Sequence, residues 1–389
     1  MTRERRVQVW RTEPTEGPMF LYRKCGVTLL TALSFFGATT ELATAQCNCA
    51  LEWSGGAVTV LGGLPGSVEN GAASINDVGE AVGVSYYAGN YSDATEWNGG
   101  TAINLGSLPG YTYSGALGVN DVGTAVGYSA NHDSFPLATE WSGDNIINLA
   151  PPGATSSIAA GINNVGQIVG SSEIGGVDYA TEWSGGSVMF LKGLPGSSAS
   201  FASGINNVGQ VVGFSVIGGV DYATEWSGGS VINLGGLPGS ISTQANGIND
   251  VGQVVGGSEI GGVEYATEWS GDSIINLGGF PGSAGSEAFS INDAGHAVGA
   301  TQVDLNEGGE FIEYATEWSG GKVIVLAGPP GAPSDYVAYS INDAGEAVGE
   351  SNPAVVPELS PWAMTALGFL GLGFAGYRWR PKLAGATNV

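Results

Sequence analysis

The sequence predicts an all-β chain folded as a seven-bladed β-propeller, and three observations lead to this fold. A Glu-Trp pair followed by Ser or Asn and then Gly occurs seven times, at intervals of 42 to 49 residues. Each copy holds four short stretches rich in Val, Ile, Tyr and Phe, which are typical of strands. Glycine supplies 67 of the 389 residues and proline 17, too many for stable helices. A period near 43 residues with four strands per unit lies in the propeller range.

The connectors between the predicted strands indicate where one blade ends and the next begins. Tight turns containing glycine suit hairpins within one sheet, whereas the connector through the Leu-Pro-Gly-Ser motif is the longest and should cross to the next sheet. If each blade begins after the long connector, the repeat region starts at the third strand of a blade, near Trp53. It ends at the second strand of a blade, near Val348. We therefore expect the first and last repeats to share one blade, which leaves no strand edge unpaired. An open β-solenoid is the alternative, because the period alone does not establish closure.

The composition limits the possible partners. The chain is 43% hydrophobic with 10 Trp, more apolar surface than a disordered chain carries, so it can bury a core. Between residues 46 and 357, Lys192 and Lys322 are the only basic residues among 31 acidic ones. Such a surface repels phosphate backbones, since nucleic-acid affinity comes mainly from Lys and Arg. Nucleic acid is therefore excluded as a partner.

Residues 1–45 have the layout of a secretory signal peptide. Two basic residues, Arg23 and Lys24, precede an apolar run at 26–38, and small residues follow up to Ala45. The run is too short to span a membrane, so we expect signal peptidase to cut between Ala45 and Gln46. Met19 is a second candidate for the start of translation. An oxidising compartment would permit a disulfide in the Cys-Asn-Cys sequence at residues 47–49.

The C-terminal end combines a linker with a Pro357-Glu358 motif (352–358), an uncharged, largely apolar stretch (359–377) and a basic tail (378–389). The apolar stretch is nearly long enough for a transmembrane helix, and the basic tail should stay cytoplasmic. This order resembles the PEP-CTERM sorting signal of Gram-negative bacteria. The resemblance implies cleavage near Pro357-Glu358 by an exosortase-type enzyme, a transient anchor in the inner membrane, and then a cell-surface or extracellular location. The alternative is an anchor that is never cleaved.

Residues 46–351 resemble the extracellular HAF-repeat family. The match runs through the strand that ends in Trp, the connector at Leu234–Gly239 and the hairpin at Ile205–Gly213. The His-Ala-Phe of the family name is replaced here by Tyr-Ala-Thr, as at Tyr222–Thr224. The resemblance implies a repeat fold and an extracellular location rather than a reaction.

Candidate ligand-binding residues lie where the repetition breaks. Tyrosines occur in two such places, a hairpin turn and a connector loop of neighbouring repeats, and exposed tyrosine rings can stack on sugar rings. The candidates are Tyr86, Tyr87, Tyr91, Tyr111 and Tyr113.

A second break is an acidic insertion in the last repeat. Carboxylate and amide oxygens are suitable ligands for calcium, although their spacing does not match a helix-flanked calcium loop. The candidate metal ligands are Asp304, Asn306, Glu307, Glu310 and Glu313. Calcium is the only cofactor that the sequence suggests.

The sequence points to no catalytic group. The only histidines, His132 and His296, lie in different repeats, with no spacing that suggests a catalytic triad or a zinc site. We expect the Glu before each repeat Trp to accept local hydrogen bonds or face solvent, the alternative being a ring of negative potential. The sequence thus predicts a non-catalytic binding or structural module of the cell surface or extracellular matrix, with polysaccharide as the candidate partner. The alternative is a polysaccharide hydrolase or lyase that uses loop carboxylates on one propeller face.

Overall fold

The computed structural model describes residues 48–351, except 90, 133, 305–310 and 330–334. The described residues all belong to one compact unit, Val27–Val355. Every regular element among them is a β-strand, which confirms the predicted all-β class. The predicted signal peptide, sorting motif, membrane segment and tail lie outside the described residues. Within the described part, no helix is long and apolar enough to cross a membrane.

The structure has 28 strands in a regular succession, four for each repeat. In chain order they are β1 (Ala50–Ser54), β2 (Ala57–Leu61), β3 (Glu69–Ile75), β4 (Ala81–Tyr87), β5 (Tyr91–Asn98), β6 (Thr101–Asn104), β7 (Tyr113–Val119), β8 (Ala125–Asn131), β9 (Ser134–Ser142), β10 (Asn145–Asn148), β11 (Ser156–Ile162), β12 (Ile168–Ile174), β13 (Val177–Ser184), β14 (Ser187–Leu191), β15 (Ala199–Ile205), β16 (Val211–Ile217), β17 (Val220–Ser227), β18 (Ser230–Asn233), β19 (Ser242–Ile248), β20 (Val254–Ile260), β21 (Val263–Ser270), β22 (Ser273–Asn276), β23 (Gly285–Ile291), β24 (Ala297–Asp304), β25 (Phe311–Ser319), β26 (Lys322–Val325), β27 (Tyr336–Ile341) and β28 (Ala347–Ser351).

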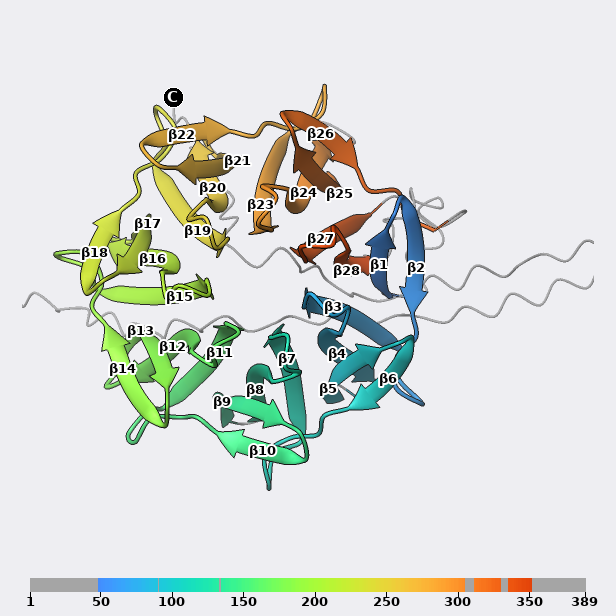
Figure 1. Cartoon of the computed structure of the whole chain (residues 1–389). Coiled ribbons are helices and arrows are strands. Elements are labelled where there is room, and N and C mark those ends of the chain that lie inside the picture. The colour runs from blue at the N-terminus through green and yellow to red at the C-terminus, as the bar shows by residue number, and fades with distance from the viewer. Residues whose placement is uncertain (1–47, 90, 133, 305–310, 330–334, 352–389) are drawn as a thin grey trace, which may run out of the picture. The chain divides into compact units, whose positions relative to one another are not determined.

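The strands form four-stranded antiparallel units arranged around a central axis, as in a β-propeller (Figure 1). In each unit the innermost strand pairs with the next one, and the order continues outward, as in β15-β16-β17-β18. Two neighbouring units, β3–β6 and β7–β10, join into one eight-stranded sheet through a single parallel pair, Ser92 with Tyr113. The structure therefore has five four-stranded sheets and one eight-stranded sheet that holds two four-stranded units.

One unit is built from both ends of the repeat region. Its strand order is β2-β1-β28-β27, and β1 pairs antiparallel with β28 so that Leu51 lies opposite Gly349 and Trp53 opposite Ala347. Figure 1 shows this as the blue start of the described chain beside its red end. The predicted shared blade is thus confirmed, and the strand pairing joins the two ends of the repeat region into a ring.

The core consists of small clusters between neighbouring units rather than one continuous centre. Trp226 on β17 is 6% exposed and packs with Val211 of its own unit and with Val169 and Ala180 of the preceding one. Its indole N–H donates to the Lys192 carbonyl at 2.7 Å. The other repeat tryptophans are buried in the same way. Each tryptophan therefore fills a gap between two units and satisfies its polar atom there.

A β-bulge in each innermost strand explains the glycine of the Val-Val-Gly motif. In β15 the register with β16 shifts between Ala202 and Gly204, which brings the Phe201 carbonyl close to Gly213. A Cβ atom on Gly213 would lie 2.0 Å from that carbonyl oxygen, so no larger residue fits. The bulge also turns an extra side chain toward the central axis of the ring.

Candidate functional site

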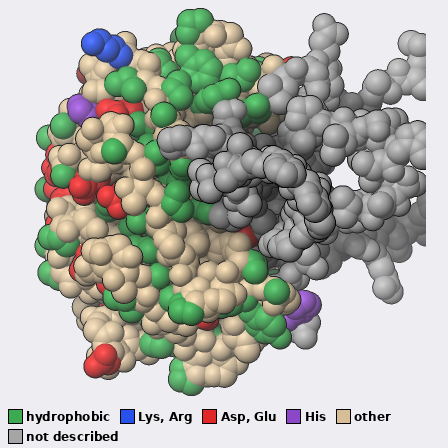
Figure 2. Space-filling view, turned by 90° about the vertical axis from the view of Figure 1, so that its right-hand side faces the viewer, with side chains coloured by type: hydrophobic (Ala, Val, Ile, Leu, Met, Phe, Trp, Pro, Cys, Tyr) green, Lys and Arg blue, Asp and Glu red, His purple; other side chains and the backbone are tan. Residues whose placement is uncertain are grey.

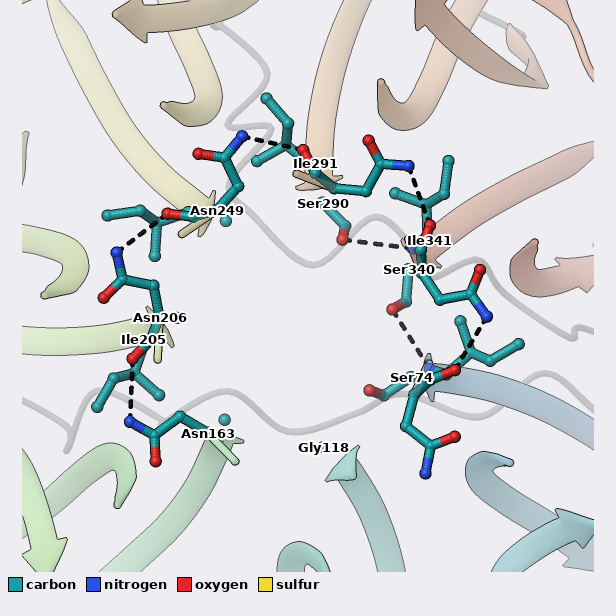
Figure 3. A pocket seen from close by; sticks show the side chains of 18 of the residues that line it. Ser74, Gly118, Asn163, Ile205, Asn206, Asn249, Ser290, Ile291, Ser340 and Ile341 are labelled. Atoms are coloured by element: carbon teal, nitrogen blue, oxygen red, sulfur yellow. Dashed lines mark hydrogen bonds between the residues drawn. The ribbon is translucent and has the colours of Figure 1, made fainter. Parts of the chain in front are cut away.

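A closed ring of hydrogen bonds surrounds the central axis. Where each innermost strand ends, an asparagine side chain donates from Nδ2 to the backbone carbonyl of the corresponding asparagine in the next unit, at 2.9 to 3.1 Å. Figure 3 shows part of this ring. The last bond of the ring, from Asn342 to the Asn76 carbonyl, joins residues 266 positions apart. The ring members are Asn76, Asn120, Asn163, Asn206, Asn249, Asn292 and Asn342. These bonds hold all the units in one register.

A second ring lies one residue further along each turn. The backbone N–H of each member donates to the side-chain Oδ1 of the next, at 2.7 to 3.0 Å. Five members carry carboxylates and two carry amides, in the ring order Asp77, Asp121, Asn164, Asn207, Asp250, Asp293 and Asp343. Burial and neighbouring aspartates raise the pKa of Asp77 and of Asp293. The second ring is therefore a negatively charged rim with a neutral gap at the two asparagines.

The two rings surround a cavity of about 280 Å³ on the axis. Its wall is made of the ends of the innermost strands from every unit, including the bulge residues. At one end the cavity reaches the second ring, several of whose members are exposed to solvent. None of the lining residues is Lys, Arg or His, so an anion would find no positive partner there.

The cavity wall is not the same all the way round. At one position of the innermost strand, three consecutive units carry serine, Ser290, Ser340 and Ser74, and the other four carry glycine (Figure 3). The Ser340 hydroxyl oxygen accepts a hydrogen bond from the Ile75 N–H at 3.3 Å, and that of Ser290 accepts one from the Ile341 N–H at 3.4 Å. The glycine positions are Gly118, Gly161, Gly204 and Gly247. At this position one arc of the wall thus carries hydroxyl groups, and the opposite arc carries glycine.

The bulge residues show the same asymmetry. Phe289 and Tyr339, in two neighbouring units of the serine arc, have ring centroids 5.7 Å apart, and Asn246 precedes them in the ring. The corresponding residues of the other units are smaller than these two aromatic residues, namely Ala73, Leu117, Ala160 and Ser203. Asn246 donates from Nδ2 to Glu287 at 3.0 Å, and the Tyr339 hydroxyl donates to Glu350 at 3.0 Å. The larger side chains of the cavity wall are therefore held in place by carboxyl groups behind them.

These carboxyl groups belong to an acidic cluster between the units. Burial, together with Glu287 and Glu259, raises the pKa of Glu264 to about 8. Burial also raises the pKa of Glu313 to about 7 and that of Glu350 to about 7, and it raises the pKa of Glu287. Glu264, Glu287, Glu313 and Glu350 do not line the cavity. Their raised pKa values favour the protonated form, and we assign these four acids a packing role.

The structure brings some of the candidate tyrosines together. The rings of Tyr91 and Tyr113, from neighbouring units, stack with centroids 5.7 Å apart and planes 11° apart, and Tyr91 is 52% exposed. Tyr87 pairs with Tyr91 across the β4–β5 hairpin, and Tyr86 pairs with Ser92. Tyr111 lies in the connector two residues before Tyr113. We call Tyr87, Tyr91, Tyr111 and Tyr113 the tyrosine cluster.

The candidate calcium ligands are only partly described. Asp304 ends β24, opposite Phe311, whereas Asn306, Glu307 and Glu310 lie outside the described residues. Glu313 accepts a hydrogen bond from Gln302 Nε2 at 3.1 Å and belongs to the acidic cluster. Within the described ranges, no group of three or more His, Cys, Asp or Glu side chains is arranged to hold a metal ion. The calcium site remains a sequence prediction. The candidate processing residues Ala45, Gln46, Pro357 and Glu358 also lie outside the described residues.

The glutamates before the repeat tryptophans are mostly engaged in local pairs. Three of them, Glu182, Glu225 and Glu268, accept hydrogen bonds at 2.9 to 3.0 Å from glutamine side chains that directly precede the neighbouring strand. In the unit where histidine replaces this glutamine, His296 Nδ1 lies 3.3 Å from Glu317. His296 is thus the counterpart of a structural glutamine.

Cys49, in the Cys-Asn-Cys sequence for which a disulfide was considered, is disulfide-bonded.

Comparisons with known proteins support the fold alone. No protein-family model matches the chain, and no curated protein matches it. Among solved structures, a puromycin-hydrolysing peptidase of Mycobacterium tuberculosis is similar with a TM-score of 0.50 and 12% identity, over 74% of this chain and 53% of that one. An Agrobacterium tumefaciens protein assigned as TolB has a TM-score of 0.46 and 12% identity, over 78% of this chain and 97% of that one. The lectin BP39L of Burkholderia pseudomallei has a TM-score of 0.41 and 12% identity, over 79% and 99%. The chain is thus a β-propeller whose activity has to be argued from its own residues.

Proposed function

We propose that this chain is an exported β-propeller that binds polysaccharide at the cell surface or in the extracellular matrix and catalyses no reaction. One observation carries the proposal, the stacked pair Tyr91 and Tyr113 at the junction of two units. Exposed aromatic faces bind the apolar faces of sugar rings. Both partners of this pair come from adjacent units, so the ring scaffold holds the platform rigid.

The acidic groups support binding rather than catalysis. Glycosidases need two carboxyl groups facing each other across the scissile bond. Here the carboxyl groups with the most strongly raised pKa, such as Glu264, lie between packed units and away from the cavity. The carboxylates of the second ring are tied to their neighbours by hydrogen bonds.

The proposal includes the route to the surface. The sequence supports cleavage by signal peptidase between Ala45 and Gln46, transient anchoring by residues 359–377 and release by an exosortase near Pro357 and Glu358. The resemblance to HAF repeats, which are extracellular, supports the same location. The acidic, base-poor repeat region suits contact with neutral polysaccharide better than contact with anionic polymers.

A polysaccharide-binding assay tests the proposal. The full chain, Tyr91→Ala and Tyr113→Ala would be compared on a glycan array and by co-sedimentation with the insoluble polysaccharides that the array identifies. Each substitution should weaken binding by about tenfold or more, because it removes one ring of the platform. Tyr179→Ala is the matched control. Tyr179 is also exposed, and its ring centroid lies 5.8 Å from that of Phe190. Both residues belong to a unit that does not contain Tyr91 or Tyr113. Retained binding in both platform variants, or no glycan bound by the unchanged chain, would refute the proposal.

A further inference from the structure

We infer that the central cavity is a second binding site, for a single neutral sugar residue, and that the ligand lies against the arc formed by Ser74, Ser290, Ser340, Phe289, Tyr339 and Asn246. Figure 3 shows the three serines of this arc. This inference takes its ligand class from the proposed function, but the site is separate from the tyrosine cluster. The cavity lies on the axis, whereas the tyrosine cluster lies at the ends of β4, β5 and β7.

The break in repetition points to this arc. A purely structural ring would repeat one residue at each position, as the asparagine ring does in every unit. The room for a side chain differs among the glycine positions, since a Cβ on Gly247 would lie 2.8 Å from the Phe289 carbonyl oxygen and one on Gly161 would lie 3.4 Å from the Ser203 carbonyl oxygen. Three consecutive serines and two aromatic rings therefore place hydroxyl and aromatic groups on one side of the cavity. The closure of the ring of units does not require these groups.

The chemistry of the arc fits a neutral polyhydroxyl compound. Ser290 and Ser340 use their oxygens as acceptors within the ring, which leaves their hydroxyl hydrogens available as donors. Asn246 directs only its Nδ2 into the bonds with Glu287 and the Ala288 carbonyl. Phe289 and Tyr339 supply the apolar faces on which sugar rings pack.

The volume of the cavity and the charge of its rim restrict the class of ligand further. A volume of about 280 Å³ lies below the range of drug-sized ligand pockets, so one sugar ring rather than a chain segment fits inside. The second ring carries Asp77, Asp293 and Asp343 beside one another at the rim. A uronic acid or a sulfated sugar would meet this negative potential without any positive group to compensate for it.

The arc also explains the hydrogen bonds behind it. Asn246 bonds to Glu287, and Tyr339 to Glu350. Both bonds fix the orientation of these side chains, and a preformed wall lowers the entropy that binding must remove. Asn246 and Tyr339 are thus positioned before any ligand enters.

The experiment measures binding of glucose, galactose and mannose, with glucuronic and galacturonic acids as charged counterparts, to the full chain by saturation-transfer NMR and calorimetry. We expect at least one neutral hexose to bind with a Kd on the order of 1 mM, and the uronic acids to bind at least about tenfold more weakly. Ser290→Gly combined with Ser340→Gly restores the residue of the other units, and Phe289→Ala restores that of Ala73 and Ala160. Each variant should weaken hexose binding about tenfold or more.

Two further variants separate this site from the proposed function. Ser203→Ala, on the opposite arc, should bind hexose like the unchanged chain, and so should Tyr91→Ala. The inference is overturned if no neutral hexose binds, if the uronic acids bind equally well, or if the serine and Phe289 variants bind normally. A chain that binds polysaccharide through Tyr91 but no hexose in the cavity leaves only the proposed function standing. Hexose binding in the cavity without polysaccharide binding at the tyrosines would support the cavity site and refute the proposed function.

Discussion

At the scale of single residues, the repeat tryptophans carry much of the packing between units. Trp226→Ala should lower the free energy of unfolding by about 3 to 5 kcal/mol, because it removes a buried ring from a closed gap. Trp226→Phe keeps most of the volume and loses the hydrogen bond to the Lys192 carbonyl, so it should cost only about 1 to 2 kcal/mol. Chemical denaturation measures both. A loss below about 1 kcal/mol for the alanine variant would contradict the buried position of Trp226.

The acidic cluster predicts how stability depends on pH. Glu264, Glu313 and Glu350 have folded-state pKa values of about 7 to 8, above the value near 4.5 of an exposed glutamate. Between these values the folded state binds more protons than the unfolded state, so stability falls as pH rises. This contribution is complete below about pH 4.5 and is lost above about pH 8.

Thermal unfolding between pH 5 and pH 9 checks this prediction. The Tm should fall by roughly 5 to 10 °C over that range, because several carboxyl groups must ionise while buried. Glu264→Gln, which keeps a neutral side chain, should flatten the profile, and the exposed Asp144→Asn should leave it unchanged. A Tm that rises from pH 5 to pH 8 would show that these carboxyl groups are not buried as described.

At the scale of elements, the bulge in each innermost strand requires glycine at the facing position of the adjacent strand. Gly213→Ala should destabilise the protein by about 3 kcal/mol or more, since the new Cβ would overlap the Phe201 carbonyl oxygen, a backbone atom. Gly228→Ala is the matched control. Gly228 has φ +57° and no atom near its Cβ position, so alanine there should cost only about 1 kcal/mol. Equal losses in denaturation experiments would argue against the bulge.

The sequence was sufficient to predict the strands, their order and the shared blade. The turn residues and the long connector indicated where each blade begins, because hairpin turns within a sheet are shorter than connections between sheets. It did not reveal the asparagine ring. Asn206 and Asn249 read as turn residues, and a spacing of 43 says nothing about whether their side chains meet at an axis. The serine arc was missed for the same reason, although Ser290 and Ser340 do stand where other repeats have glycine.

The tyrosine cluster shows how far loop residues can be placed from sequence. Tyr91 and Tyr113 were singled out because they interrupt the repeat, and a platform needs them to stack. Their contact depends on the side-by-side packing of two units, with Ser92 paired to Tyr113. That packing follows from the ring geometry and cannot be read from the spacing between the two tyrosines.

At the scale of the whole molecule, acidic residues greatly outnumber basic ones in the repeat region. With two basic residues among 31 acidic ones between residues 46 and 357, this region should repel anionic surfaces. Figure 2 shows acidic side chains spread along one edge of the molecule, with very few basic ones in view. Binding through aromatic and hydroxyl groups is consistent with that surface.

Processing gives a prediction at the same scale. Surface material from a host that carries an exosortase should lack residues 378–389, because cleavage near Pro357 and Glu358 removes the anchor. Replacing both motif residues with alanine should leave an uncut form in the membrane fraction. Mass spectrometry of surface and membrane fractions measures both. Peptides from the basic tail in mature surface protein would contradict exosortase cleavage.

The central claim is that the two ends of the repeat region join in one sheet and close the ring. The hydroxyl of Ser54 on β1 lies 3.3 Å from the carboxylate of Glu346, just before β28 and 292 residues away. The most direct measurement is disulfide formation in the full chain carrying Ser54→Cys and Glu346→Cys, located by peptide mass spectrometry. A closed ring predicts rapid intramolecular cross-linking of this pair and none for Ser227→Cys with Glu346→Cys, in which Ser227 is the counterpart of Ser54 in another unit. Failure of Cys residues at 54 and 346 to cross-link in the folded protein would contradict the closed ring.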